Sequence, residues 1–468
     1  MSTIAVPFRT RDWLVLHGPR VFVLAVWLMM SLLAARHIAR YGRNVPIGDD
    51  FTLIPYWTGE KPVTLSYLWA QHNEHRVPFY KIILVSLGWL TEADVRAGMW
   101  LNFTLLSATA LFASLQLGRI RRQSNWTDAI IPLLLLHLGH TRTLTFTGML
   151  HPVGCTVINF TILMLIGRIP RQRMSLRRAL ALVVCVACLT GWGANSLPVV
   201  PVLGAWLAYA GWHQWRHRRS VGALLFLGAV MAWALCGLYL LGWHRNPGHP
   251  VSPGVRQSLW SFVNVLSLAS GHVNTPHRIF YALAVVVALI VAAAVAVRVV
   301  RRFPDERLRA TGLLAVLMGV LAMALAIGHA RTWYADTASF GLHYVLVMSP
   351  MLVAAYLIVA LHAPPRAAPA LQGAMFLLVA IAAWQDYALG EKSGRDMKQI
   401  VRAIEVEIRA GVPPEQVAKK CLAIHPAPTI VAAGLQSLQQ AHMGPYKQHA
   451  KGKRDIQHPS RHERIGTP

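Results

Sequence analysis

The sequence predicts an all-α integral membrane protein that crosses a bilayer about eleven times and carries a large first external loop. Hydrophobic residues make up 55% of its 468 residues, and its mean hydropathy is +0.43. Both values lie above those of soluble domains of this length. Apolar runs suited to helices recur along the chain. The short turns between them are rich in arginine, as cytoplasmic turns of membrane proteins are.

The first span is predicted at 21–35, after a cytoplasmic N-terminus, 1–20, that contains three arginines. Because no convincing cleavage site follows the apolar run, we expect an anchor rather than a signal peptide. The first external loop, 36–94, comes next. Within it, 79–90 is apolar but shorter than the roughly 20 residues that a spanning helix needs. We therefore predict that this segment is an interfacial helix.

Ten further spans complete the predicted bundle, which covers 21–388. They are 95–117, 129–138, 153–166, 179–189, 197–210, 221–241, 279–297, 311–327, 344–361 and 371–387. A second external loop is predicted at 242–278 and a third at 328–343. The basic turns alternate with the spans so that the N-terminus is cytoplasmic and the C-terminus is external, which in a bacterial inner membrane is the periplasmic side.

Beyond the last span we predict an external amphipathic helical tail, 389–442. Val401, Ile404 and Ile408 follow helical spacing there, with charged residues between them. From 443 to 468 the chain is basic and nearly free of apolar residues, a composition that predicts disorder.

The formal charge of +26 raises the question of nucleic acid. The basic residues, however, stand in short turns between apolar runs. The sequence has no soluble domain in which basic and aromatic residues alternate, as they do in nucleic-acid-binding proteins. We therefore expect membrane lipids as partners and no nucleic acid. Four of the five cysteines lie inside apolar segments, where small hydrophobic residues are the expected role.

Asp49 and Asp50 are the candidate catalytic residues. Gly48 frees the backbone just before them, and adjacent side chains in a turn point in different directions. We expect one carboxylate to face a cavity, with a pKa raised toward that of a general base, and the other to cap the turn. The alternative is that both are solvated loop acids that cap helices.

A dense polar run further along the same loop supplies candidate substrate-binding residues. The pattern predicts a helix over 63–76 with His72, His75 and Arg76 on one face, continuous with an apolar stripe that lies on the membrane. A cationic edge at that depth suits a phosphate carried on a lipid. Glu74 points elsewhere on this helix and is expected to form a pair or a cap. The alternative is that the cations interact with the helix C-terminus and snorkel.

The third external loop is the other concentration of polar and aromatic groups. Arg331 follows an apolar helix directly and is placed to hold an anion, although an ordinary interface anchor is the alternative. Tyr334, His343 and Tyr344 are further candidate substrate contacts in this segment. We expect Arg76 and Arg331 to converge on one anion in a shared cavity.

A metal site is not required by the sequence. His72 and His75 offer two ligands at most, and their spacing differs from that of the zinc hydrolases. Asp49 or Asp50 could complete such a site, so a divalent metal is possible. No cofactor is predicted with certainty.

Two segments are similar to loops of a known superfamily. They read DDFTLIPYW…YLWAQHNEHRVPFYK in the first loop and HARTWYADTASFGLHY in the third. With one N-terminal span, a large external loop and many later spans, the chain resembles the GT-C superfamily of membrane glycosyltransferases. Protein O-mannosyltransferases and the aminoarabinose transferases of lipid A belong to it, and the loops look like those of uncharacterised bacterial members.

The resemblance implies a polyprenyl-phosphate-linked sugar as donor and a lipid, glycan or protein acceptor on the outer face. It places the catalytic carboxylate of an inverting transfer on Asp49 or Asp50. Two other functions remain open. A lipid or lipid-linked-sugar flippase is one, although the predicted spans carry few acidic residues or lysines near their centres, where coupling sites are expected. A membrane acyltransferase that uses an external histidine is the other.

Overall fold

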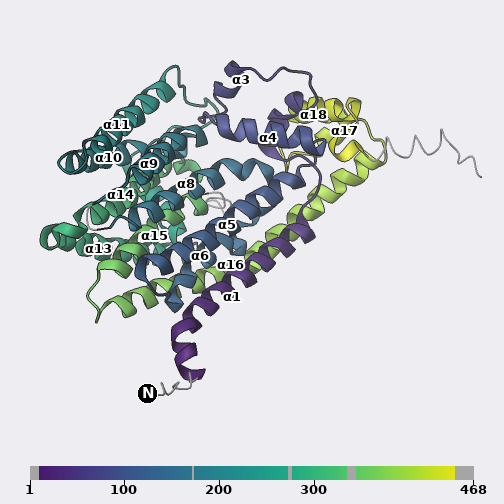
Figure 1. Cartoon of the computed structure of the whole chain (residues 1–468). Helices are drawn as coiled ribbons and strands as arrows, with labels where there is room; N and C mark the ends of the chain where they lie inside the picture. The colour runs from purple at the N-terminus through teal and green to yellow at the C-terminus, as the bar shows by residue number, and fades with distance from the viewer. Residues whose placement is uncertain (1–9, 171–172, 272–276, 335–343, 448–468) are drawn as a thin grey trace, which may run out of the picture.

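The computed structural model describes residues 10–170, 173–271, 277–334 and 344–447 (Figure 1). Within these ranges the chain is helical and forms no strand, apart from one isolated bridge between His72 and His75. The predicted all-α class is therefore confirmed.

Eight segments of the described chain are long and apolar enough to cross a membrane. Each is built on one long helix: α1 (Thr10–Tyr41), α5 (Arg96–Arg121), α8 (Leu150–Gly167), α11 (Arg219–Leu240), α13 (Arg278–Arg302), α14 (Arg307–Ala330), α15 (Val345–His362) or α16 (Ala368–Arg409). The core surrounds α15, in which 83% of the 18 residues are buried. The residues near the middle of this helix are all apolar or small. Such a helix, hydrophobic on all sides, is the centre of the bundle.

Three predicted spans correspond to shorter helices. They are α6 (Ile130–Leu136), α9 (Leu176–Leu189) and α10 (Val199–Trp215), with 7, 14 and 17 residues respectively. The 3-10 helices η2 (Trp126–Ala129) and η3 (Leu138–His140) extend the α6 segment at both ends, and α7 (Thr141–Thr145) continues it.

Contacts between helix ends define two ends of the bundle. One end carries the arginine-rich turns, and we call it the basic end. There Arg121 donates a hydrogen bond of 3.0 Å to Gln372, and Arg309 donates one of 3.2 Å to the carbonyl of Gly167. At the opposite end, which we call the loop end, the amide of Val95 donates to Asn44 across 3.0 Å. The arginine-rich turns and the first loop thus lie at opposite ends.

The first loop folds into four short helices at the loop end. They are η1 (Gly48–Thr52), α2 (Ile54–Trp57), α3 (Leu65–Trp69) and α4 (Pro78–Thr91). The apolar segment predicted at 79–90 is α4, and it exposes Ile82, Trp89 and Leu90 on its outer face.

The helix predicted over 63–76 is wrong, because α3 ends at Trp69. The ammonium group of Lys81 donates hydrogen bonds of 2.7 Å to the carbonyls of both Tyr67 and Ala70, and so terminates α3 from outside. The chain then reverses through Asn73, whose φ of 50° is left-handed. His72, His75 and Arg76 therefore share no helical face.

The last span and the predicted amphipathic tail are one helix. α16 runs for 42 residues without a break and ends just before Gly411, whose φ is 74°. Residues 411–447, which we call the C-terminal module, contain α17 (Pro414–Lys419), α18 (Pro428–Gln440) and η11 (Gly444–Tyr446). The chain is ordered here to Lys447, and Tyr446 is buried. The remainder of the tail predicted to be disordered lies outside the described residues.

The C-terminal module packs on the first loop, where α18 contacts α2 and η1 (Figure 1). The amide of Gly48 donates a hydrogen bond of 2.9 Å to the carbonyl of Ile424, and the amide of Gly444 donates one of 2.8 Å to that of Glu92. The ring of Phe51 meets that of His425 at 5.6 Å between centroids. The module therefore supports the backbone directly before Asp49.

Candidate active site

Asp49 and His72 form an ion pair at the surface of the first loop. The Nε2 atom of His72 lies 3.2 Å from Oδ1 of Asp49, and 40% of the Asp49 side chain is exposed. Burial alone would raise the pKa of Asp49, but the hydrogen bond to His72 and the charges of His72 and His151 hold it at about 2. The expectation of a raised pKa for the exposed carboxylate is therefore wrong, because histidines surround it.

Asp50 has the other role predicted for the acidic pair. It is 1% exposed, and its Oδ2 atom accepts a hydrogen bond of 3.1 Å from the amide of Ile47, which caps η1. Burial, together with the negative charge of Asp49, raises the pKa of Asp50 well above its ordinary value. The two neighbouring carboxyls thus differ: one is ionised and accessible, the other is buried and favours its protonated form.

His75 and His151 lie side by side behind this pair, with their ring centroids 5.3 Å apart. Nδ1 of His75 accepts a hydrogen bond of 3.0 Å from the amide of Ala194, so the proton of the neutral ring is on Nε2. Burial lowers the pKa of His75 to about 3, which keeps the ring neutral. Gly193 permits this contact: its φ is 104°, and a Cβ there would lie 3.1 Å from Nδ1 of His75.

Glu74, Arg331 and His249 bring together the three predicted loops. Oε2 of Glu74 lies 2.8 Å from Nη2 of Arg331, and Oε1 of Glu74 pairs with Nδ1 of His249. Nε of Arg331 donates to the hydroxyl of Tyr344 across 3.0 Å. Burial alone would raise the pKa of Glu74, but hydrogen bonds from Arg331 and His249 lower it. The pairing expected of Glu74 is therefore present, with partners far away in the sequence.

A cavity of about 310 Å³ opens beside this cluster. The polar part of its lining includes Glu74, His75, Asn195, Arg245, His329, Arg331 and Tyr344, and the apolar part includes Pro198, Trp243, Met323 and Ile327. The lining thus combines cationic donors with apolar side chains, two of them from α14. The shape and chemistry fit an amphipathic ligand that carries an anionic group.

Arg76 does not line this cavity, contrary to the expectation that it shares an anion with Arg331. Its guanidinium donates hydrogen bonds of 3.0, 2.9 and 2.7 Å to the carbonyls of Tyr239, Trp69 and Leu241, and its amide donates to the hydroxyl of Tyr239. The side chain is buried and fixes the end of α11 to the first loop. Its donors are used by the protein itself.

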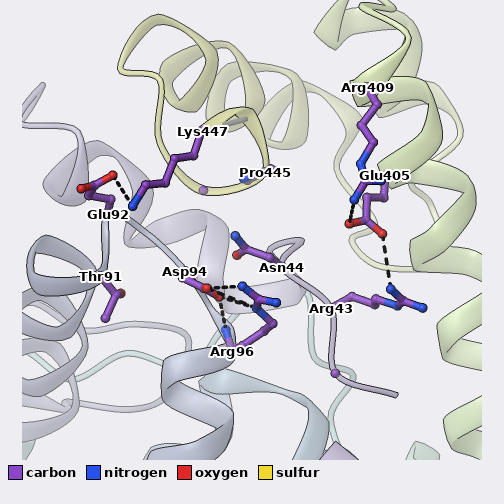
Figure 2. A pocket seen from close by; sticks show the side chains of 12 residues that line it. Arg43, Asn44, Thr91, Glu92, Asp94, Arg96, Glu405, Arg409, Pro445 and Lys447 are labelled. Atoms are coloured by element: carbon purple, nitrogen blue, oxygen red, sulfur yellow. Dashed lines mark hydrogen bonds and ion pairs between the residues drawn. The ribbon is translucent and has the colours of Figure 1, made fainter. Parts of the chain in front are cut away.

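Figure 2 shows a second cavity, of about 390 Å³, between α5, the end of α16 and the C-terminal module. Its charged side chains pair with one another: Glu92 with Lys447 at 2.7 Å, Asp94 with Arg96, and Glu405 with Arg409 at 2.8 Å and with Arg43 at 3.9 Å. Because each charge on this wall has a partner, we interpret the cavity as a polar seam that joins the module to the bundle.

Sequence reasoning missed several residues of the site. His151 and His249 stand among many other histidines near predicted loops, and no spacing distinguishes them; Asn195, Arg245 and Trp243 are likewise unmarked. Of the predicted contacts, His343 and the side chain of Tyr334 lie outside the described part of the protein. Among the described residues, no group of three histidine, cysteine, aspartate or glutamate side chains is placed to hold a metal ion.

Comparisons of the chain with protein families, with curated proteins and with solved structures find no match.

Proposed function

We propose that this protein is an inverting membrane glycosyltransferase of the GT-C type. It would move a sugar from a polyprenyl-phosphate donor to an acceptor on the outer face of the membrane. The observation that carries the proposal is that His75 lines the cavity at Arg331 and also lies, with His151, near the accessible Asp49 carboxylate. Such a transfer needs a group that takes the proton of the attacking hydroxyl and an anion site that holds the leaving phosphate, both close to the reacting sugar.

The cavity at Arg331 is the proposed donor site. Its apolar wall, with Met323 and Ile327 on α14, would hold the first prenyl units, and its polar wall would bind the phosphate. Arg331 and Arg245 would stabilise the charge that gathers on this phosphate as the sugar leaves. His75 lines the same cavity, and its Nε2 proton would donate to a sugar or phosphate oxygen.

Asp49 and His72 are the proposed acceptor side of the reaction. With a pKa of about 2, Asp49 is a weak base and is suited to accepting a hydrogen bond from the attacking hydroxyl. His72, 3.2 Å away, is the residue that would carry the proton onward. An imidazole oriented by a carboxylate is a common arrangement for this task.

The contacts at the two ends of the bundle support about eleven crossings. The chain returns to the loop end at Thr147, which donates to the carbonyl of Val95, and at Ala194, which donates to His75. It returns to the basic end at Gln214, which accepts from the amide of Met174. The segments containing α6, α9 and α10 would therefore each cross once, in addition to the eight longer ones.

The C-terminal module sits on the first loop, so an odd number of crossings is needed to place both on one side. We accordingly expect residues after α16 to be periplasmic. Alkaline phosphatase fused after Lys447 should be active in cells, and a cytoplasmic fluorescent reporter there should be dark. The reverse pattern would place the module and the proposed site in the cytoplasm.

The function itself is tested by reconstituting the full chain in liposomes with polyprenyl-phosphate sugars. Transfer of a radiolabelled sugar, with release of polyprenyl phosphate, is the expected result. A protein that transfers nothing from any such donor but moves lipid between leaflets would instead be a flippase.

Removing the C-terminal module is expected to lower transfer by about 100-fold, because the Gly48 amide loses its partner at Ile424 and Asp49 moves. The variant is a chain that ends at Arg409, measured in the same liposome assay. A chain that ends at Lys447 is the matched control, since it keeps the whole module. Equal transfer by both chains would show that the module does not position the acid.

A further inference from the structure

The carboxylate of Glu74 occupies the position at Arg331 that an anionic ligand of the cavity would use. Oε2 of Glu74 contacts Nη2 of Arg331 at 2.8 Å, and both side chains line the cavity wall. They are 12% and 14% exposed, so the pair is nearly buried yet accessible from the cavity.

The other contacts of Arg331 leave Glu74 as its described anionic partner. Nε donates to the neutral hydroxyl of Tyr344 at 3.0 Å, and Nη1 lies 2.9 Å from Nδ1 of His249. An arginine nitrogen cannot accept a hydrogen bond, so a proton on Nδ1 of His249 is donated to the carboxylate of Glu74. Arg331 and His249 therefore both direct donors at one carboxylate.

Carboxylates and phosphates use the same face of a guanidinium group, so they compete for it. We propose that Glu74 is an internal substitute for the donor phosphate, which displaces it from Arg331 when the lipid-linked sugar binds. This inference rests on the proposed function, in which Arg331 binds that phosphate. Glu74 keeps the buried guanidinium paired while the cavity holds no donor, and it lowers the affinity for weaker anions.

The exchange would also stabilise the transition state more than the bound donor. A phosphodiester carries one negative charge and competes with Glu74 on nearly equal terms. As the sugar leaves, the phosphate gains charge and attracts Arg331 more strongly than a carboxylate does. Release of Glu74 would therefore be completed as the glycosidic bond breaks.

The test compares binding of polyprenyl phosphate to the full chain and to Glu74→Gln, by titration in detergent. If about a tenth of the protein has Arg331 free at rest, removing the competitor should tighten binding about tenfold. Glu92→Gln is the matched control, because Glu92 pairs with Lys447 in the exposed seam and should leave the affinity unchanged. Arg331→Gln should bind weakly.

Equal or weaker binding by Glu74→Gln, with binding that still depends on Arg331, would overturn the exchange and leave the proposed function standing. Binding that ignores Arg331 in every variant would overturn the proposed function as well.

A measurement on the unaltered protein covers the case in which Glu74→Gln does not fold. Polyprenyl phosphate should accelerate hydrogen exchange at the amides around Glu74, because the loop loses its contact with Arg331. Slower exchange there on binding would mean that Glu74 stays in place, and would overturn the proposal.

Discussion

Asp49→Asn is expected to reduce sugar transfer by about 100- to 10,000-fold, the usual cost of disabling general-base catalysis, because Asp49 orients both the attacking hydroxyl and the His72 ring that takes its proton. The neutral amide cannot hold the ion pair with His72, and it presents a donor where the attacking hydroxyl needs an acceptor. Folding should be unaffected, because 40% of the Asp49 side chain is exposed and it supports no buried contact. Initial rates in liposomes, at matched protein insertion, are the measurement.

Asp50→Asn is the matched control for that experiment. Its carboxyl is buried, favours the protonated form and accepts from the amide of Ile47, and an asparagine oxygen can accept the same bond. We expect a loss of transfer far smaller than that of Asp49→Asn. If both variants transfer at the original rate, neither carboxylate takes part and the proposed mechanism fails.

Arg331→Gln is expected to reduce transfer by about 100- to 1,000-fold, because a preorganised donor to the leaving phosphate is lost. It should also destabilise the fold by about 1–3 kcal/mol, since Glu74, in its nearly buried site, loses Arg331 and keeps His249 as its partner. Thermal unfolding in detergent and the liposome assay measure the two effects separately.

The double variant Glu74→Gln with Arg331→Gln separates a structural role of Arg331 from a catalytic one. Removing both charges should restore much of the stability, because no unpaired charge remains. Transfer should stay low, since the donor to the phosphate is still missing. Recovery of transfer together with stability would show that Arg331 only holds the loops together.

The sequence predicts the helical bundle well because bundle formation depends on local composition. Apolar runs and arginine turns identify all eight of the long apolar helices in the described chain, with limits that differ by several residues and by more in α1 and α16. The same reasoning identifies α4 as a short apolar helix outside the predicted spans. Signals of this kind lie within a window of about twenty residues.

The first loop is predicted less well because distant residues decide its structure. Lys81 ends α3 through the carbonyl of Tyr67, and nothing in the stretch 63–76 signals that stop. Arg76 is fixed by the carbonyl of Tyr239, 163 residues away. Its positive charge alone suggested that it binds an anion, whereas its partners are carbonyl groups of the protein. The low pKa of Asp49 depends first on its hydrogen bond to His72 and then on the charges of His72 and His151, and His151 reaches the acid only in the folded bundle.

The continuity of α16 constrains how this chain can change length. At about 1.5 Å per residue, its 42 residues make a rod of about 63 Å, twice the thickness of a bilayer core. One residue inserted in the outer half would turn everything beyond it by about 100°. The C-terminal module could then no longer meet both Gly48 and Glu92. Insertions should therefore be tolerated in the turns of the basic end, whereas the number of residues between Gln372 and Gly411 should be fixed by the contact of the module with the first loop.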